Sequence, residues 1–254
     1  MPLSAAAQAR IAIPEGIYYH RFASISRGVE AIWINPAGLS AGQSIYLQYI
    51  NEFEDGDFID SRGYTITGEG IGISYRSLEE FNGEDYREFL FGIGTALFQG
   101  FHIGFSYRYI KDGYGLYNKR HFWNGGIMIE KYQNVRLGAV FSNLNRGKVN
   151  GERSEIEQLY SISYLAYENS LILSGEVTFS GSESFSDARY RFGAEFRASP
   201  RVRIFGMVDE DKFFQLGLRI GLGQYYGGLQ SRFDSESDHD GSSLYGGVSY
   251  LPRR

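Results

Sequence analysis

Apolar residues alternate with small or charged residues along most of this chain, at a period of two. Residues 100–110 show the pattern well, because the positions between the apolar ones hold His, Gly, Ser and Arg. The apolar set in this stretch is Phe101, Ile103, Phe105, Tyr107 and Tyr109. Since successive side chains of a strand point to opposite faces, each such stretch predicts a β-strand with one apolar and one polar face.

Alternation and turn signals together predict about fourteen strands. Their expected ranges are 43–52, 58–67, 70–77, 86–98, 101–110, 122–131, 135–143, 158–166, 171–179, 188–197, 201–208, 213–222, 225–233 and 242–250. All five prolines lie outside these ranges, as expected because proline cannot donate to a strand ladder. The connections alternate between tight turns and mostly longer polar loops, such as residues 144–157, which is typical of an up-and-down barrel in an outer membrane.

The fold class predicted is therefore all-β, a single antiparallel up-and-down transmembrane β-barrel. About fourteen strands enclose a lumen too wide for side chains alone to fill. The face opposite the apolar set carries charges in mid-strand, and we expect these to point into the lumen, because a basic group in lipid costs about 2–4 kcal/mol. The predicted luminal polar residues are Arg76, Arg108, Arg136, Glu176, Arg191, Glu195 and Arg219. A large soluble sandwich, or two smaller barrels, is the alternative.

Composition narrows the function classes. The 254 residues include 33 glycines and 16% aromatic residues, which favour strands over helices. Cysteine is absent, so neither disulfides nor thiolate metal sites are available. The net charge of −5 gives no reason to expect a nucleic-acid partner. No run of eighteen apolar residues predicts a membrane-spanning helix, but a transmembrane barrel needs only short alternating segments.

Catalytic chemistry has no signature in the sequence. The four histidines are scattered without metal-ligand spacing, and no Ser–His or Asp–His constellation is recognisable. We therefore expect no catalytic residue, no metal, no cofactor and no enzymatic activity.

The first residues, 1–9, read MPLSAAAQA, and two interpretations stay open. The small residues are similar to the end of a secretory signal with an A-x-A-type cleavage site, but the basic start and apolar core of a signal are missing. The alternative is a short disordered tail.

Residues 26–40 read SRGVEAIWINPAGLS, in which Asn-Pro predicts a turn before the first strand. The segment resembles the A-x-x-x-N-P-A-G-L segment of the FadL-like outer-membrane superfamily. That superfamily includes long-chain fatty-acid transporters and the PorV/PorQ-type proteins of type IX secretion. The matching positions are Ala31, Asn35, Pro36, Ala37, Gly38 and Leu39. Further segments, such as FHIGFSYRYIKDG and YRFGAEFRASPRVRIFG, are similar to shorter PorV-like members.

The resemblance implies that residues 10–42 form a plug inside a barrel of residues 43–254, in a bacterial outer membrane. An even strand number would place both termini on the periplasmic side. Two features depart from the family: the chain is shorter than typical fatty-acid transporters, and it continues past Tyr250 to LPRR instead of ending on an aromatic residue.

The resemblance suggests a plugged barrel that binds a secretion channel or a cargo protein, with outer-membrane lipid around it. The first alternative is a FadL-type transporter of hydrophobic small molecules. The second is a soluble all-β binding protein.

Overall fold

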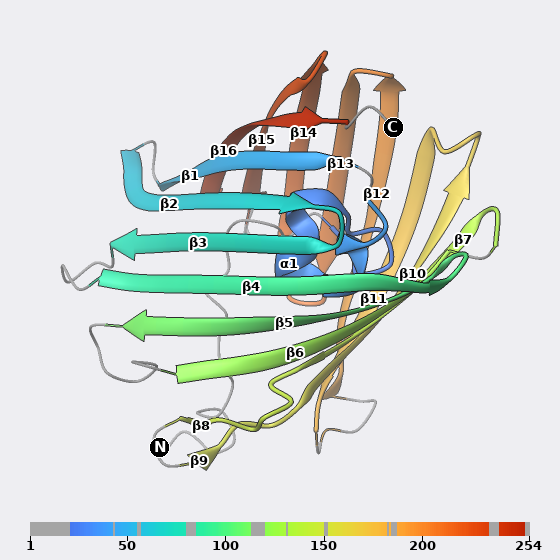
Figure 1. Cartoon of the computed structure of the whole chain (residues 1–254). Coiled ribbons are helices and arrows are strands. Elements are labelled where there is room, and N and C mark those ends of the chain that lie inside the picture. The colour runs from blue at the N-terminus through green and yellow to red at the C-terminus, as the bar shows by residue number, and fades with distance from the viewer. Residues whose placement is uncertain are drawn as a thin grey trace.

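Fourteen antiparallel strands close into one barrel in the computed structural model of the chain (Figure 1). The structure describes residues 21–42, 44–54, 57–79, 85–112, 120–130, 132–149, 152–181, 183, 187–233 and 239–251. The barrel strands are β1 (Ile45–Glu54), β2 (Asp57–Gly68), β3 (Ile71–Glu79), β4 (Asp85–Phe98), β5 (Phe101–Asp112), β6 (Arg120–Ile129), β7 (Val135–Ser142), β10 (Glu157–Ala166), β11 (Leu171–Ser180), β12 (Arg189–Ser199), β13 (Val202–Asp209), β14 (Phe214–Leu222), β15 (Tyr225–Phe233) and β16 (His239–Tyr250).

The order of the strands is up-and-down, as the alternating connections predict. Each barrel strand pairs with the next barrel strand along the chain, and β1 pairs with β16 to close the sheet. Closure removes the free strand edges that would otherwise need backbone partners, which is the condition for spanning a bilayer with strands. The predicted fold class is thereby confirmed, and so is the number of strands.

One element was not predicted. Residues 144–157 were expected to be a loop, but they contain a small hairpin of β8 (Lys148–Val149) and β9 (Glu152–Arg153). These strands are two residues long, too short for alternation to be recognised in the sequence.

Tight turns connect the strands at one end of the barrel. Gly70, Gly100 and Gly223 each have a positive φ, between 65° and 88°, in the turns that precede β3, β5 and β15. Glycine adopts this backbone conformation without the steric cost that a Cβ imposes. At the opposite end the hairpin of β8 and β9 extends the connection from β7 to β10.

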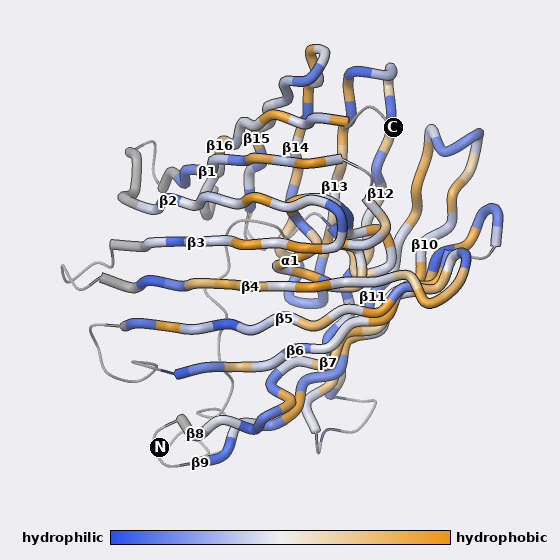
Figure 2. The backbone as a smooth tube through the Cα atoms, in the orientation of Figure 1, coloured by the Kyte–Doolittle hydropathy of each residue, from blue (hydrophilic) through white to orange (hydrophobic). Residues whose placement is uncertain are grey.

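The exterior of the barrel is apolar. Large hydrophobic side chains on it are exposed on β1 to β6 and β10 to β16, and examples are Phe105, Ile162, Phe192, Leu218 and Leu244. In Figure 2, β3 and β4 are hydrophilic toward one end and hydrophobic over most of the remaining length. An exterior of this kind is what strands that face lipid require.

An aromatic ladder crosses the outer face of the first five strands. Tyr49, Tyr64, Tyr75, Phe89 and Tyr109 stand directly opposite one another in successive strand pairs. The ring centroids of Tyr49 and Tyr64 are 5.1 Å apart, and those of Tyr75 and Phe89 are 4.9 Å apart. Aromatic bands of this kind mark the level where lipid meets water in outer-membrane barrels.

Three short helical segments lie inside the ring of strands (Figure 1). They are η2 (Gly28–Glu30), α1 (Ala31–Ile34) and η3 (Pro36–Leu39). None of the helices in the described part of the chain is long and apolar enough to span a bilayer.

The hydrophobic core is the interface between this inner segment and the barrel wall. In one cluster Ala31, Ile32 and Leu39 pack against Leu90 of β4. In a second, Phe22 and Ile25 pack with three residues of the wall: Leu165, Ile172 and Met207. In a third, Trp33 and Ile34 pack against Ile50, Tyr226 and Tyr245. Apolar side chains therefore gather at two places: they are buried around the inner segment and exposed on the exterior of the barrel.

The apolar exterior predicts that a charge placed on the outer face destabilises the barrel more at the middle of a strand, deep in the bilayer, than at its end. Leu218 lies in the middle of β14 and Leu222 at its end, next to a tight turn, and both side chains are exposed on the same outer face. We expect Leu218→Arg to destabilise the barrel in liposomes by about 2–4 kcal/mol and Leu222→Arg by about 0–1 kcal/mol. Equilibrium unfolding of both variants in phosphatidylcholine liposomes measures the difference. Equal destabilisation would show that this face does not lie in hydrocarbon.

Candidate functional site: the luminal plug and its anchors

Residues 21–42, here called the plug, occupy the lumen, and most of their side chains are buried. Residues 1–9 and residues 10–20 of the predicted plug lie outside the described residues. The plug starts at the β11 and β12 side of the barrel, where the backbone N–H of Ala23 donates to Glu176 Oε2 at 3.0 Å. It ends against β4, β5 and β6, which contact η3.

Asn35 joins three parts of the structure and is completely buried. Its side-chain oxygen accepts a hydrogen bond from the backbone N–H of Ala37 at 3.1 Å, which caps η3. Its side-chain amide donates to the backbone oxygens of Ala23, at 2.8 Å, and of Ile127 on β6, at 3.0 Å. Pro36 begins η3, where its missing N–H costs nothing. The Asn-Pro pair thus shapes the turn and fixes the plug to the wall.

Glycines make the close approach of plug and wall possible. On the plug, a Cβ added to Gly38 would lie 3.1 Å from the Cβ of Ala31 and would also clash with the backbone of Ser26. On the wall, a Cβ added to Gly92 would lie 2.9 Å from Leu39 Cδ1, and one added to Gly94 would lie 2.7 Å from the backbone oxygen of Pro36. The plug backbone therefore packs directly on the backbone of the wall strands.

Serine side chains continue this contact on the other side of the plug. Ser24 Oγ lies 2.8 Å from Ser161 Oγ and 2.7 Å from Ser163 Oγ, and all three side chains are buried. Ser163 Oγ in turn lies 2.7 Å from Ser174 Oγ on β11. Each hydroxyl both donates and accepts, so the ladder satisfies polar atoms that the plug removes from water.

A pair of arginines and a pair of glutamates anchor the start of the plug. Arg21 Nη1 lies 2.8 Å from Glu195 on the wall, and its Nε lies 3.1 Å from Glu30 of the plug. Arg219 Nη1 on β14 lies 3.6 Å from the other carboxylate oxygen of Glu30. Burial alone would lower the pKa of Arg21, but the carboxylates of Glu195 and Glu30 outweigh it and hold that pKa above its usual value. Arg21 therefore keeps its charge in the lumen.

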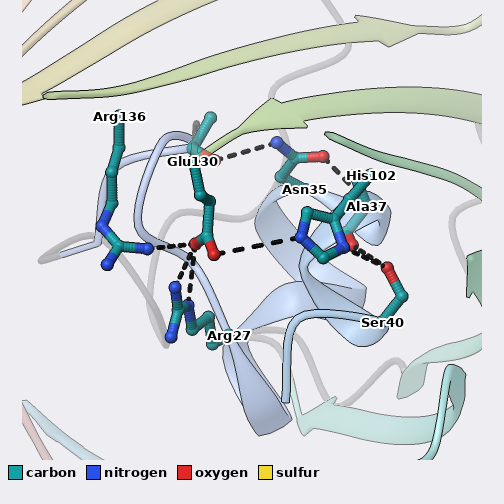
Figure 3. Close-up of polar contacts among 8 residues, drawn as sticks. Arg27, Asn35, Ala37, Ser40, His102, Glu130 and Arg136 are labelled. Carbon is teal, nitrogen blue, oxygen red and sulfur yellow. Dashed lines mark hydrogen bonds and ion pairs between the residues drawn. The ribbon is translucent and has the colours of Figure 1, made fainter. Parts of the chain in front are cut away.

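A second polar group ties the middle of the plug to the wall (Figure 3). The Glu130 carboxylate pairs with both Arg27 of the plug and Arg136 of β7. His102 on β5 lies between this group and the plug, with Nδ1 at 2.9 Å from Ser40 Oγ and Nε2 at 3.9 Å from Glu130 Oε2. In this group the plug and the wall thus neutralise each other's charges through ion pairs.

The remaining predicted luminal residues pair within the wall. Glu88 on β4 is completely buried, and its carboxylate pairs with both Arg76 and Arg108. The guanidinium carbon of Arg76 lies 5.7 Å from the centre of the Trp33 ring. Arg191 pairs with Glu176 and also donates to the backbone oxygen of Arg21 at 3.2 Å. All seven charged residues singled out in the sequence therefore lie on the luminal side.

Sequence reasoning missed five partners of the predicted residues: Arg21, Glu30, Glu88, Glu130 and Arg203. Glu88 could have been found, because it stands directly opposite Arg76 in the register of β3 and β4, and its parity matches. Arg21 and Glu30 lie in the plug, outside any periodic pattern, so nothing in the sequence indicated where their side chains point. Among the described residues, no group of three or more His, Asp or Glu side chains is arranged to hold a metal ion.

Comparison of the sequence with models of known protein families gives no match, and comparison with curated proteins gives none either. Solved structures resemble the barrel. The toluene transporter TbuX of Ralstonia pickettii aligns over 92% of this chain and 96% of its own, with a TM-score of 0.62 and 10% identity. A FadL homologue of Pseudomonas aeruginosa aligns over 90% and 95%, with a TM-score of 0.52 and 7% identity. The outer membrane protein Omp33 of Acinetobacter baumannii aligns over 82% and 98%, with a TM-score of 0.53 and 8% identity.

At such low identities the similarity concerns the fold alone. The chain has the fold of FadL-type and related outer-membrane barrels, and none of these three structures carries a PorV or PorQ description.

The wall glycines predict that an added methyl group will loosen the plug. In Gly126→Ala the new Cβ would lie 2.9 Å from Pro36 Cδ and 3.2 Å from the backbone nitrogen of Ala37, so the plug must shift. We expect a destabilisation of about 1–3 kcal/mol in denaturant titrations. The matched control is Gly221→Ala, also on a luminal strand position, where the nearest atom would be 3.8 Å away. If both variants were equally stable, the plug would not be packed against β6.

Proposed function

We propose that the chain is an outer-membrane barrel that admits hydrophobic small molecules past a luminal plug. The observation that carries the proposal is the combination of a barrel with an apolar exterior and a plug that packs through apolar clusters on opposite sides of the lumen. A plugged barrel blocks water-soluble solutes, while a hydrophobic solute can exchange with apolar contacts between plug and wall. The similarity in fold to TbuX, described as a toluene transporter, supports the same class of substrate.

A PorV-type role, in which the barrel binds a secretion channel or carries cargo, has less support. It rests on the NPAGL segment and on similar strand sequences, and both are equally compatible with a FadL-type transporter. A soluble all-β protein is disfavoured by the exterior, where exposed side chains such as Phe98, Phe192 and Leu222 would stand in water.

The orientation that we propose follows from the connections. Outer-membrane barrels place short turns in the periplasm and longer loops outside the cell. The turns at Gly70, Gly100 and Gly223 would then be periplasmic, and the hairpin of β8 and β9 would face the exterior. Both termini would lie on the periplasmic side.

Uptake of toluene by whole cells tests the transport proposal. In cells whose outer membrane lacks other hydrocarbon channels, expression of the chain should raise the initial rate of [14C]toluene uptake several-fold over empty-vector cells, because the lipopolysaccharide layer is the barrier that the barrel bypasses. Heat-modifiable gel migration confirms that the barrel is folded in the same cells. No increase with a folded barrel, together with co-purification of a stoichiometric protein partner, would favour the PorV-type role instead.

Deleting the plug should convert the barrel into an open pore. Removal of residues 21–42 leaves wall pairs that include Glu88 with Arg76 and Arg108, and Glu176 with Arg191, so the wall still neutralises its buried charges. We expect the variant to fold, and to conduct small ions in planar bilayers at levels well above those of the wild type. Equal and negligible conductance of the two proteins would show that this segment does not occlude the lumen.

A further inference from the structure

A cavity of about 330 Å³ lies beside the plug, between the plug and the wall of the barrel. Its lining includes Asn169 in the tight turn between β10 and β11, so the cavity reaches the end of the barrel where the tight turns lie. The plug contributes Arg21, Ile25 and residues 27–30 on one side, and β1, β7 and β10 to β14 contribute the other side. The cavity adjoins the hydrophobic cluster of Phe22 and Ile25, which shares Ile25, Leu165 and Ile172 with its lining.

Arginine dominates the lining of this cavity, which is here called the arginine chamber. The arginines that line it are Arg21, Arg27, Arg136, Arg197, Arg203 and Arg219. Glu30 is the one acidic residue among the described residues of the lining. The arginines come from the plug, β7, β12, β13 and β14, so no single element accounts for their convergence.

The carboxylates around the chamber do not balance these charges. Glu30 and Glu195 pair with Arg21, and the same two acids also serve Arg219 and Arg203. Glu130 serves both Arg27 and Arg136, whose guanidinium groups converge on it from two directions (Figure 3). Among the described residues, three carboxylates therefore stand against six guanidinium groups, an excess of three positive charges.

Arg197 is an example of this excess of positive charge. In the described part of the chain it forms no ion pair, although it stands on the luminal face of β12, two residues from Glu195. Like charges held close together in a space partly shielded from water repel one another, and an anion in the space between them relieves that repulsion. Planar guanidinium groups also match the geometry of carboxylate and phosphate oxygens.

The chamber also has an apolar side. Ile25, Leu165 and Ile172, which belong to one of the buried hydrophobic clusters, line it together with Val29. A ligand that fits this arrangement has several anionic groups for the arginines and a short carbon skeleton for the apolar side. The volume suits a small molecule and excludes a folded protein segment.

We propose that the arginine chamber binds a small organic anion that carries two or more carboxylate or phosphate groups. Binding there stabilises the seated plug, because the anion bridges arginines of the plug, Arg21 and Arg27, to arginines of the wall. The chamber borders one of the apolar clusters invoked in the proposed function, but its arginines are not part of that route, so anion binding is tested without any measurement of hydrocarbon transport.

Isothermal titration of the full-length barrel in an uncharged detergent at low salt tests the proposal. The probes are pyrophosphate and propane-1,2,3-tricarboxylate, and the trimethyl ester of the latter serves as an uncharged control of similar shape. We expect at least one anionic probe to bind, the ester not to bind, and the affinity to fall as sodium chloride is added. Binding of pyrophosphate alone assigns a phosphorylated ligand, and binding of the tricarboxylate alone assigns a carboxylate ligand.

The variant Arg197→Gln/Arg203→Gln removes two charges from the chamber while Glu195 keeps Arg21 as its partner. It should raise the dissociation constant of the bound probe at least about tenfold, since charge-assisted hydrogen bonds are lost. The matched control is Arg201→Gln, which removes a charge from the exposed tight turn between the same two strands. Heat-modifiable migration shows that each variant is folded.

Three outcomes would overturn the proposal. The first is that neither anion binds the wild-type barrel at low salt. The second is that the ester binds as tightly as the tricarboxylate. The third is that Arg201→Gln weakens binding as much as the double variant, because the anion would then be held by the surface charge of the rim.

Discussion

A closed wall of fourteen strands encloses more space than its own side chains fill, and the plug is the element that occupies it. Many of the luminal contacts depend on this fit. The wall carries glycines where the plug backbone approaches and serines where the plug has a hydroxyl. It carries carboxylates where the plug has arginines. Without the plug, these small and charged residues would line a water-filled pore.

The buried charges explain why the plug sits in one place. Replacing one partner of a buried ion pair leaves an uncompensated charge, at a cost of about 3–5 kcal/mol. A plug shifted by one residue would separate the buried pair of Arg21 and Glu195. It would also separate Glu130 from Arg27, whose side chain is 39% exposed, so that this second pair contributes less. Apolar contacts tolerate small shifts more easily, so the ion pairs fix the register of the plug while the hydrophobic clusters stabilise it.

The barrel could be predicted from the sequence because lipid and lumen impose a strict alternation on each strand. The parity that sets Phe105 against Arg108 also places the seven charged residues on the luminal side, without any knowledge of neighbouring strands. The partners of those residues could not be derived in the same way. Glu88 depends on the register of β3 and β4, and Glu30 depends on the path of an irregular segment whose contacts to the wall are distant in sequence. The β8–β9 hairpin is too short to leave a periodic signal.

The separation in sequence between the plug and its anchors has a consequence for biogenesis. Ser24 contacts residues 137 and 139 positions later in the chain, and the Ala23 backbone contacts Glu176, 153 positions later. Arg219, which approaches Glu30, lies still nearer the C-terminus. Contacts between residues so far apart in the sequence form late, because the long stretch of chain between them must be organised before the two residues can meet. The N-terminal segment is synthesised before the strands that it contacts, so its complete set of contacts can form only after β14 has joined the wall.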